Sequence, residues 1–211
     1  GLMGYFSWAS NDEHYTLAKY TSNVFVPGAV ADTYYSYSGR TFVDPGTTDR
    51  GPLIAGLFAA GVCGVGRYVS EPFITTATYP NVLFDRYTRG FNMAESFYAA
   101  CPNLKWKTVV AGDPLMAPYA TPPSVSISVD DTTFHDVETI TVNASDDSGI
   151  SKVRVYIGDK IIGETSTCPY TLQIDTCEYP IGAHTIEAIA YENSLTATQG
   201  SAKLQVVVDN Q

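Results

Sequence analysis

The chain has few cations and no long apolar segment. Among its 211 residues, 12 Lys and Arg stand against 22 Asp and Glu, which gives a formal net charge of −10. Affinity for nucleic acid and for anionic membranes comes largely from clustered cations, so this balance argues against both kinds of partner. No run of 18 apolar residues occurs, so the sequence predicts no membrane-spanning helix. Charged residues are only 16% and hydrophobic residues 45%, which indicates a globular protein rather than a disordered or coiled-coil chain.

Cysteine is also scarce, and its spacing fits no zinc cluster. The four cysteines are Cys63, Cys101, Cys168 and Cys177. Four cysteines, few lysines and many Thr, Ser and Tyr residues are common in secreted chains, so we expect an extracellular or cell-surface location. Gly1 stands in place of Met and no positively charged signal sequence follows it, as expected after removal of a leader or an upstream segment.

The composition changes at a proline-rich segment. Three prolines within residues 118–123 cannot lie inside a helix or a central strand. Residues 1–121 hold 8 Lys and Arg against 9 Asp and Glu, a net −1, whereas residues 122–211 hold 4 against 13, a net −9. Such asymmetry predicts two domains with separate surfaces. The expected division is an α/β domain over 1–119, a linker over 120–123 and a β-sandwich over 124–211.

Six segments of the second part alternate between apolar and polar residues, as strands with one buried face do. They are residues 124–129, 139–142, 152–157, 170–174, 184–191 and 204–208. This density of short strands predicts an all-β sandwich. Several motifs over residues 122–209 resemble bacterial Ig-like domains of secreted proteins, and the resemblance implies a spacer, adhesive or packing module without chemistry. These motifs include Asp146 to Ile157, Cys168 to Tyr170, Gly182 to Thr185 and Ala188 to Tyr191.

The first part combines strand-like and helix-like segments. Strands are expected over residues 4–8, 62–69 and 108–111, and helices over 53–60 and 93–100. This alternation predicts an α/β domain with a small parallel sheet. Three strands are few for such a sheet, so we expect half a domain that takes a strand from another protein chain or from a second copy.

Short motifs spread over residues 1–119 resemble an uncharacterised bacterial secreted family. That family is distantly similar to gingipain-like cysteine peptidases of the caspase-like fold. The motifs are Phe6 to Asp12, Pro27 to Thr33, Ser38 to Phe42, Ala60 to Val65, Tyr68 to Pro72, Leu83 to Tyr87, Ala94 to Tyr98 and Gly112 to Leu115. The resemblance implies the C-terminal part of such a domain, with a partial caspase-like parallel sheet.

The same resemblance indicates lost chemistry. In those peptidases the catalytic His lies in a turn after one strand, and the Cys nucleophile ends the next strand. Here the matching turn holds Trp8, whose indole has no basic nitrogen, and the matching strand end, which includes Asp32, has no cysteine. We therefore expect no peptidase activity and a structural Trp8. Cys63 and His14 could replace the peptidase Cys and His, but we favour this pair less because Cys63 lies within an apolar strand.

We expect the thiols of Cys63 and Cys101 to form a disulfide. The first lies near the start of a strand, and the second ends a helix that is expected to run back antiparallel across the sheet. Cys168 and Cys177 flank the strand over 170–174, which holds them too far apart to bond unless the chain bends.

Two further sets of side chains are candidate binding groups. Tyrosines in a hydroxyl-rich stretch can stack on sugar rings, although such residues more often pack under a loop or in a protein interface; they are Tyr34, Tyr35 and Tyr37. Paired carboxylates at strand ends can hold calcium, although a solvated acidic loop is the commoner explanation; they are Asp130, Asp131, Asp146 and Asp147. No other cofactor is expected.

These features favour a non-catalytic extracellular or cell-surface protein that serves structure or partner contact in an assembly. A processed fragment of a gingipain-like cysteine peptidase, completed by a separate N-terminal chain, is the alternative. A carbohydrate-binding surface protein is a second alternative, which rests on the three tyrosines.

Overall fold

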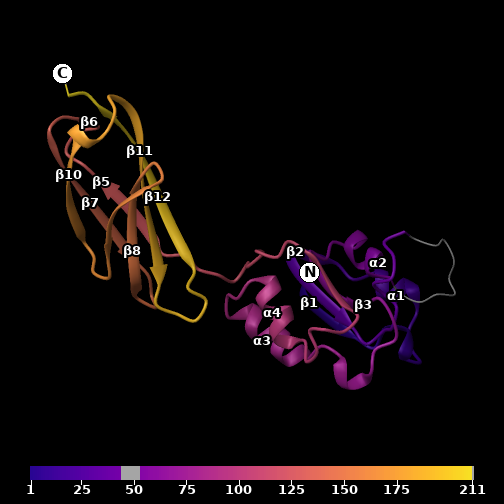
Figure 1. Cartoon of the computed structure of the whole chain (residues 1–211). Coiled ribbons are helices and arrows are strands. Elements are labelled where there is room, and N and C mark those ends of the chain that lie inside the picture. Colours follow the sequence, from indigo (N-terminus) through magenta and orange to yellow (C-terminus); the bar gives the residue numbers. More distant parts are fainter. Residues whose placement is uncertain (44–52, 211) are drawn as a thin grey trace. The chain divides into compact units, whose positions relative to one another are not determined.

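The computed structural model describes residues 1–43 and 53–210, which divide into two compact units, Gly1–Ala120 and Thr121–Gln211 (Figure 1). The division falls within the proline-rich segment. None of the helices in these described ranges combines the length and the hydropathy of a membrane span.

The first unit is built on a four-stranded sheet. Its strands, in spatial order, are β1 (Leu2–Ser7), β2 (Phe25–Thr33), β3 (Gly64–Tyr68) and β4 (Thr108–Gly112). The first three are parallel, and β4 is antiparallel to β3. The sheet is therefore mixed, not wholly parallel as expected, and it contains one strand more than composition and periodicity predicted. That strand is β2, whose Pro27-Gly28 pair is typical of a turn.

Helices pack on both faces of this sheet. They are α1 (Leu17–Thr21), α2 (Ile54–Ala59), α3 (Pro80–Thr88) and α4 (Met93–Ala100), with short 3-10 helices η1 (Ala9–Asn11) and η3 (Ile74–Thr76). Successive residues of β2 point to opposite faces. Val30 accordingly packs with side chains of α3 and α4, whereas Ala31 packs with side chains of α1 and α2. The first unit therefore has a core on each side of its sheet.

Helix α4 lies close to β3 because this strand carries glycines. A Cβ atom at Gly64 would lie 2.3 Å from Sδ of Met93, and one at Gly66 would lie 2.7 Å from Cε1 of Phe97. Met93 comes first in the helix and Gly64 first in the strand, so α4 and β3 run in the same direction. A capping box between Asn92 and Glu95 begins the helix.

The second unit is a two-layer β-sandwich. Its strands are β5 (Ser124–Ser128), β6 (Thr133–Phe134), β7 (Val137–Ser145), β8 (Ile150–Ile157), β9 (Lys160–Thr165), β10 (Tyr170–Asp175), β11 (Gly182–Glu192) and β12 (Gln199–Val208), with the 3-10 helix η4 (Thr176–Glu178). One sheet has the order β10-β7-β5 and the other β6-β12-β11-β8-β9. The apolar positions of the alternating segments, such as Ile140, Val155 and Ile186, form one buried core. All six predicted strands are present, and β6 and β9 are additional.

Candidate functional site

The carboxyl ends of β1, β2 and β3 meet at one edge of the sheet in the first unit. Ligands in open α/β sheets bind outside this edge, because loops from several strands converge there. Trp8 follows β1, and Tyr34 follows β2. The Tyr34 amide donates a 2.8 Å hydrogen bond to the Ser7 carbonyl, and the Asn11 side chain donates to the Tyr34 carbonyl. The two loops are therefore joined directly.

Trp8 presents its ring to solvent at this edge. Its ring centroid lies 4.5 Å from that of Tyr34, at an interplanar angle of 45°, and Trp8 is 52% exposed. Phe6 supports Tyr34 from β1, with ring centroids 4.8 Å apart. Trp8 was expected to be structural, and the neighbouring rings support its indole without enclosing it.

The three candidate tyrosines divide between the surface and the core. Tyr35 is partly buried and packs on the core cluster under α1 and α2. Tyr34 lies beneath Trp8, and Tyr37 is 42% exposed with φ at +60°, a conformation that costs free energy for a bulky side chain. Ala9, next to Trp8, also has a positive φ of +48°. Backbone strain therefore occurs in both loops that present aromatic rings.

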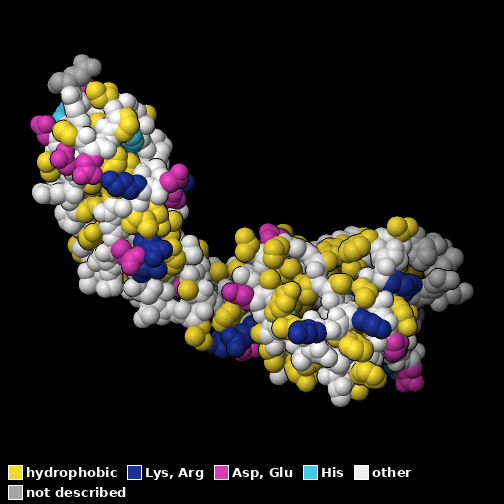
Figure 2. Space-filling view, viewed as in Figure 1, with side chains coloured by type: hydrophobic (Ala, Val, Ile, Leu, Met, Phe, Trp, Pro, Cys, Tyr) yellow, Lys and Arg dark blue, Asp and Glu magenta, His cyan; other side chains and the backbone are white. Residues whose placement is uncertain are grey.

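Sequence reasoning missed Tyr79, which belongs to the same surface. It precedes α3 and is 48% exposed. Its neighbour Thr78 donates a 3.0 Å hydrogen bond from its amide to the hydroxyl of Tyr68, the last residue of β3. Burial, the charge of Asp32 and the phenol of Tyr79 together raise the pKa of Tyr34. We call Trp8, Tyr34, Tyr37 and Tyr79 the aromatic surface. Figure 2 shows exposed hydrophobic side chains spread over this unit.

A polar hollow of about 190 Å³ lies between β1, η1 and α1. Ser7 and Ala9, the two neighbours of Trp8 in the chain, both line it. Its other polar lining includes one carboxylate, one ammonium group and several hydroxyls, from Asp12, Lys19, Tyr5, Tyr15 and Thr16. The hollow therefore offers hydrogen-bond donors and acceptors, with one carboxylate and one ammonium group among them.

A buried ion pair lies beneath the aromatic surface. Asp32 lies one residue before the end of β2 and is 1% exposed, and its carboxylate accepts from the guanidinium of Arg67, which is fully buried in β3. Burial raises the pKa of Asp32 to about 6, although Arg67 and Thr78 act in the opposite direction. A charged residue inside the apolar run of β3 was the sequence signal for this pair. Asp32 is thus enclosed and cannot attack a substrate.

The expected disulfide is not formed. Cys63 and Cys101 are both free, because α4 runs along β3 in the same direction and not antiparallel to it. Cys63 precedes β3, whereas Cys101 lines a cavity with Thr108, which pairs with the last residue of β3. The disulfide expectation is therefore wrong for this structure. The second pair, Cys168 and Cys177, is also free and is separated by the extended β10.

Cys63 and His14 also lie apart. The Cys63 thiol accepts from the Gly28 amide at 3.2 Å, at the amino end of β3. His14 is exposed, lies beyond the carboxyl end of β1 and makes a 3.5 Å contact with Glu13. Parallel strands therefore hold the thiol and the imidazole at opposite ends of the sheet, and no nucleophile–base pair forms from them.

The acidic pairs lie at opposite ends of β5 in the sandwich. The carboxylate of Asp131 accepts from the Thr133 amide at 3.0 Å, and that of Asp146 accepts from the Ser148 amide at 2.7 Å. Asp130 and Asp147 flank these turns in the chain. Within the described residues, no group of three His, Cys, Asp or Glu side chains is arranged to hold a metal ion.

A second cavity, of about 380 Å³, lies between α4 and β4. Met93, Phe97, Cys101, Thr108 and Val110 are among its lining residues. This cavity lies in the same unit as the aromatic surface, but its walls come from α4 and the edge strand β4.

The family described as Bacterial Ig domain matches residues 123–188. This part of the chain is a bacterial Ig-like domain, as the sequence motifs predicted, and such domains are typically extracellular or surface-displayed. It is a type of non-catalytic structural or interaction module. The match leaves residues 1–122 outside it. A comparison with curated proteins gave no match.

Solved structures similar to the chain include the fibronectin(III)-like modules of Clostridium thermocellum CbhA. These share 22% identity at a TM-score of 0.35, over 41% of this chain and 98% of theirs. An endo-beta-1,4-mannanase from Thermotoga petrophila shares 15% identity at a TM-score of 0.34, over 46% of this chain and 22% of its own. The Clostridium perfringens spore cortex lytic enzyme SleM shares 18% identity at a TM-score of 0.34, over 47% of this chain and 34% of its own. The matched part of the chain thus spans 22% of one enzyme and 34% of the other.

Proposed function

We propose that this chain is a non-catalytic interaction protein of the cell surface or extracellular space. In this proposal the α/β unit makes the specific contact, and the Ig-like unit serves as a spacer or packing module. The observation that carries it lies at the carboxyl edge of the sheet. Asp32 is enclosed in an ion pair with Arg67, whereas Trp8 and Tyr37 are presented to solvent. This arrangement suits binding better than chemistry.

The finer proposal is that the α/β unit is a degenerate gingipain-like domain. Its support is the order of the short motifs and the location of two segments. The Trp8 turn follows β1, and Asp32 lies near the end of β2, the neighbouring strand. The resemblance assigns the peptidase base and nucleophile to such positions. An indole and a buried carboxylate in these places support a pseudoenzyme.

Assembly through the sheet is the second part of the proposal. Strand β1 ends the strand order, so one of its backbone edges has no strand neighbour among the described residues of this unit. Tyr5 and Phe6 of β1 are only partly buried, whereas residues 29–33 of the adjacent β2 are buried. A strand from another chain or a second copy would pair with this edge and cover these aromatic rings.

Incubating the full chain with a library of Arg- and Lys-containing peptides tests the absence of catalysis. We expect no cleavage and no labelling by thiol-directed peptidase inhibitors. A Cys63→Ala variant is the matched control. Cleavage that disappears in this variant would favour the alternative, a processed fragment of a cysteine peptidase. The carbohydrate-binding alternative is supported by the exposed indole of Trp8.

A further inference from the structure

We propose that the groove between α4 and the edge strand β4 binds an extended segment of another protein by strand addition. This inference names a further contact surface for the proposed function and rests on that proposal. Strand β4 ends the sheet order on the side opposite to β1, and it pairs only with β3 among the described residues. The cavity of about 380 Å³ lies along the same strand. Main-chain hydrogen bonds and a side-chain pocket are therefore offered together, which is what an extended peptide needs.

The hydrogen-bond pattern of β4 shows which of its backbone groups are unpaired. The Val69 amide donates a 2.9 Å bond to the carbonyl of Lys107, which lies opposite it by the β3–β4 register. Hydrogen-bonded and non-hydrogen-bonded pairs alternate along an antiparallel ladder, so Val109 and Ala111 also bond to β3. The amides and carbonyls of the intervening residues therefore point toward the open edge; these residues are Thr108, Val110 and Gly112.

The residues with unpaired backbone groups also line the cavity. Thr108, Val110 and Gly112 are all among its lining residues. In a strand added antiparallel to this edge, the residue opposite each of them exchanges both backbone hydrogen bonds with it and turns its side chain to the same face of the sheet. Alternate side chains of a bound segment would thus face the cavity, and the same residues would carry the bonding amides.

The helices on this face of the sheet pack over the strands before β4. Phe84 of α3 lies over Gly4 of β1, and Met93 of α4 lies over Gly64 of β3. The cavity therefore begins where α4 ends its cover of the sheet, and its other wall is the edge strand. This arrangement leaves the groove accessible along β4.

The lining indicates that an apolar side chain enters the cavity. Met93 and Phe97 of α4 form one wall, and Leu104, in the segment before β4, lines the cavity and is 61% exposed. The Thr108 hydroxyl is buried and has no hydrogen-bond partner among the described residues, so a polar group of the bound segment can satisfy it. A mostly apolar pocket with few polar groups is typical of a specificity pocket.

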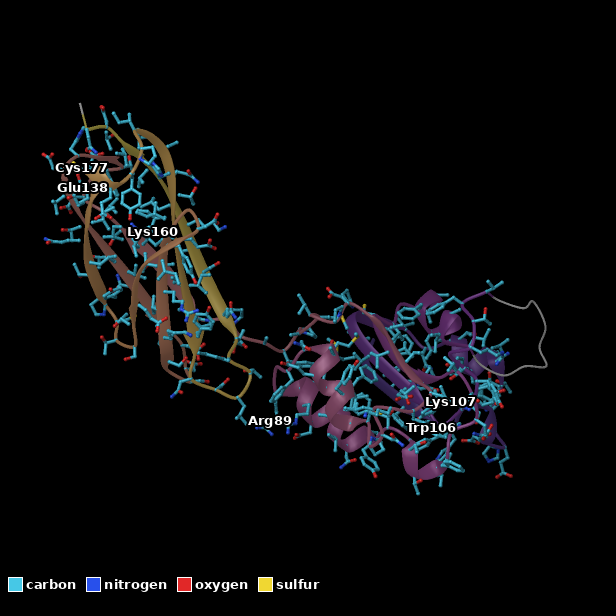
Figure 3. All side chains as sticks on the ribbon, viewed as in Figure 1. Arg89, Trp106, Lys107, Glu138, Lys160 and Cys177 are labelled. Atoms are coloured by element: carbon cyan, nitrogen blue, oxygen red, sulfur yellow. The ribbon has the colours of Figure 1, made fainter. Side chains whose placement is uncertain are left out.

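Charges at the two ends of β4 set the direction of the segment. Lys105 and Lys107 are exposed just before the strand, and Asp113 is exposed just after it (Figure 3 labels Lys107). A segment antiparallel to β4 places its carboxyl end near the two lysines and its amino end near Asp113. Charge complementarity therefore favours an extended segment with alternate apolar residues and acidic residues at its carboxyl end.

The experiment is a titration of the full chain with short synthetic peptides, measured by fluorescence anisotropy. Each peptide alternates threonine with valine, leucine or phenylalanine and ends in two glutamates. We expect binding, and N-methylation of the apolar residues should weaken it by about tenfold or more, because their amides bond to β4. N-methylation of the threonines is the matched control and should leave affinity unchanged, because those amides point away from β4. Peptides with the glutamates at the amino end should bind more weakly.

Variants of the chain locate the site. Leu104→Ala should weaken binding by about fivefold or more, because apolar contact area is lost. Leu195→Ala makes the same change at a 78% exposed position of the second unit and should have no effect. Thr108→Pro removes an outward amide at the first residue of an edge strand, where proline is tolerated, and should weaken binding by a similar factor. Circular dichroism establishes that each variant is folded.

The free thiols give an independent measurement. Cys101 lines the cavity, whereas Cys177 is exposed in the second unit. A bound peptide should slow the alkylation of Cys101 and leave that of Cys177 unchanged, as followed by mass spectrometry of digests. This comparison needs no variant, so it holds even where Thr108→Pro fails to fold.

Absence of binding by every peptide at millimolar concentration would overturn the strand-addition site. Equal effects of N-methylation at both sets of residues, or unchanged alkylation of Cys101 in the complex, would also overturn it. Self-association of the full chain that Thr108→Pro abolishes would assign the edge to a second copy instead. A protein partner that binds elsewhere on the chain would leave the proposed function standing without this site, whereas cleavage of the peptides would refute the proposed function itself.

Discussion

Arg67 is enclosed in the first unit because it neutralises Asp32. Removing one partner of a buried pair leaves an uncompensated charge, which costs far more than losing an exposed pair. We expect Arg67→Met to lower the free energy of unfolding by about 3–5 kcal/mol, measured by urea denaturation. The control is Arg89→Met, because Arg89 makes an exposed 3.5 Å contact with Asp85 (Figure 3). It should cost less than about 0.5 kcal/mol.

The pH dependence of this pair follows from the raised pKa of Asp32. The folded value of about 6 exceeds the model-peptide value of 3.8, so the folded state holds its proton to higher pH than the unfolded state. The contribution of Asp32 to stability is therefore fully present below about pH 4 and is lost as the pH rises to about 6. Asp32→Asn should remove this slope from a plot of unfolding free energy against pH. An unchanged slope would refute the assignment.

Glu192 shows the opposite case in the sandwich. Burial acts to raise its pKa, but hydrogen bonds from Ser194, Thr196 and Thr198 outweigh burial and lower the pKa to about 2. Its stabilising contribution is thus present above about pH 4.5 and is lost as the pH falls toward 2. We expect Glu192→Gln to cost about 1–3 kcal/mol at pH 7 and less at pH 3, by thermal unfolding. Equal costs at both pH values would contradict this account.

At the scale of elements, the close packing of α4 on β3 makes a specific prediction. A methyl group at Gly66 would meet the rigid ring of Phe97 at 2.7 Å, so we expect Gly66→Ala to destabilise the first unit by about 1–3 kcal/mol. Gly56→Ala is the control. Gly56 lies in α2, where an added Cβ has its nearest neighbour at 4.0 Å, so this change should stabilise by up to about 1 kcal/mol. Denaturant midpoints of the two variants test the contrast.

Sequence periodicity located most elements but not their directions. The apolar run of β3 and the helical spacing of α4 predicted both segments closely, because each buries one regular face. The local sequence of either segment does not indicate that β3 and α4 run in the same direction. The predicted disulfide between Cys63 and Cys101 assumed the opposite direction, and it was wrong for this reason. The strand β2 was missed by periodicity because Pro27-Gly28 interrupts it.

The candidate site was predicted only in part for a similar reason. A run of tyrosines does not specify which rings point inward, so Tyr35 could not be separated from Tyr34 and Tyr37. Tyr79 lies 45 residues beyond Tyr34 in the chain, so no local sequence pattern links the two rings. Sequence patterns therefore cannot predict which distant residues the order of the strands brings together in the site.

At the scale of the whole molecule, each of the two units has its own buried core. The net charge also differs, because residues 122–211 hold nearly all of the acidity. Such units behave as separate modules, with the Ig-like unit able to keep the other in solution. We therefore expect the unpaired edge of β1 to have its largest effect on association when the first unit is studied alone.

We expect residues 1–120, expressed alone, to associate or to fold only with a partner strand, because β1 leaves a backbone edge and the rings of Tyr5 and Phe6 partly uncovered. Sedimentation velocity and thermal unfolding over a range of concentrations measure this. Leu2→Lys places a charge at a 40% exposed position of the same strand and should weaken association without disturbing the core. Cooperative unfolding of a monomer at every concentration would show that the sheet is complete without a further strand.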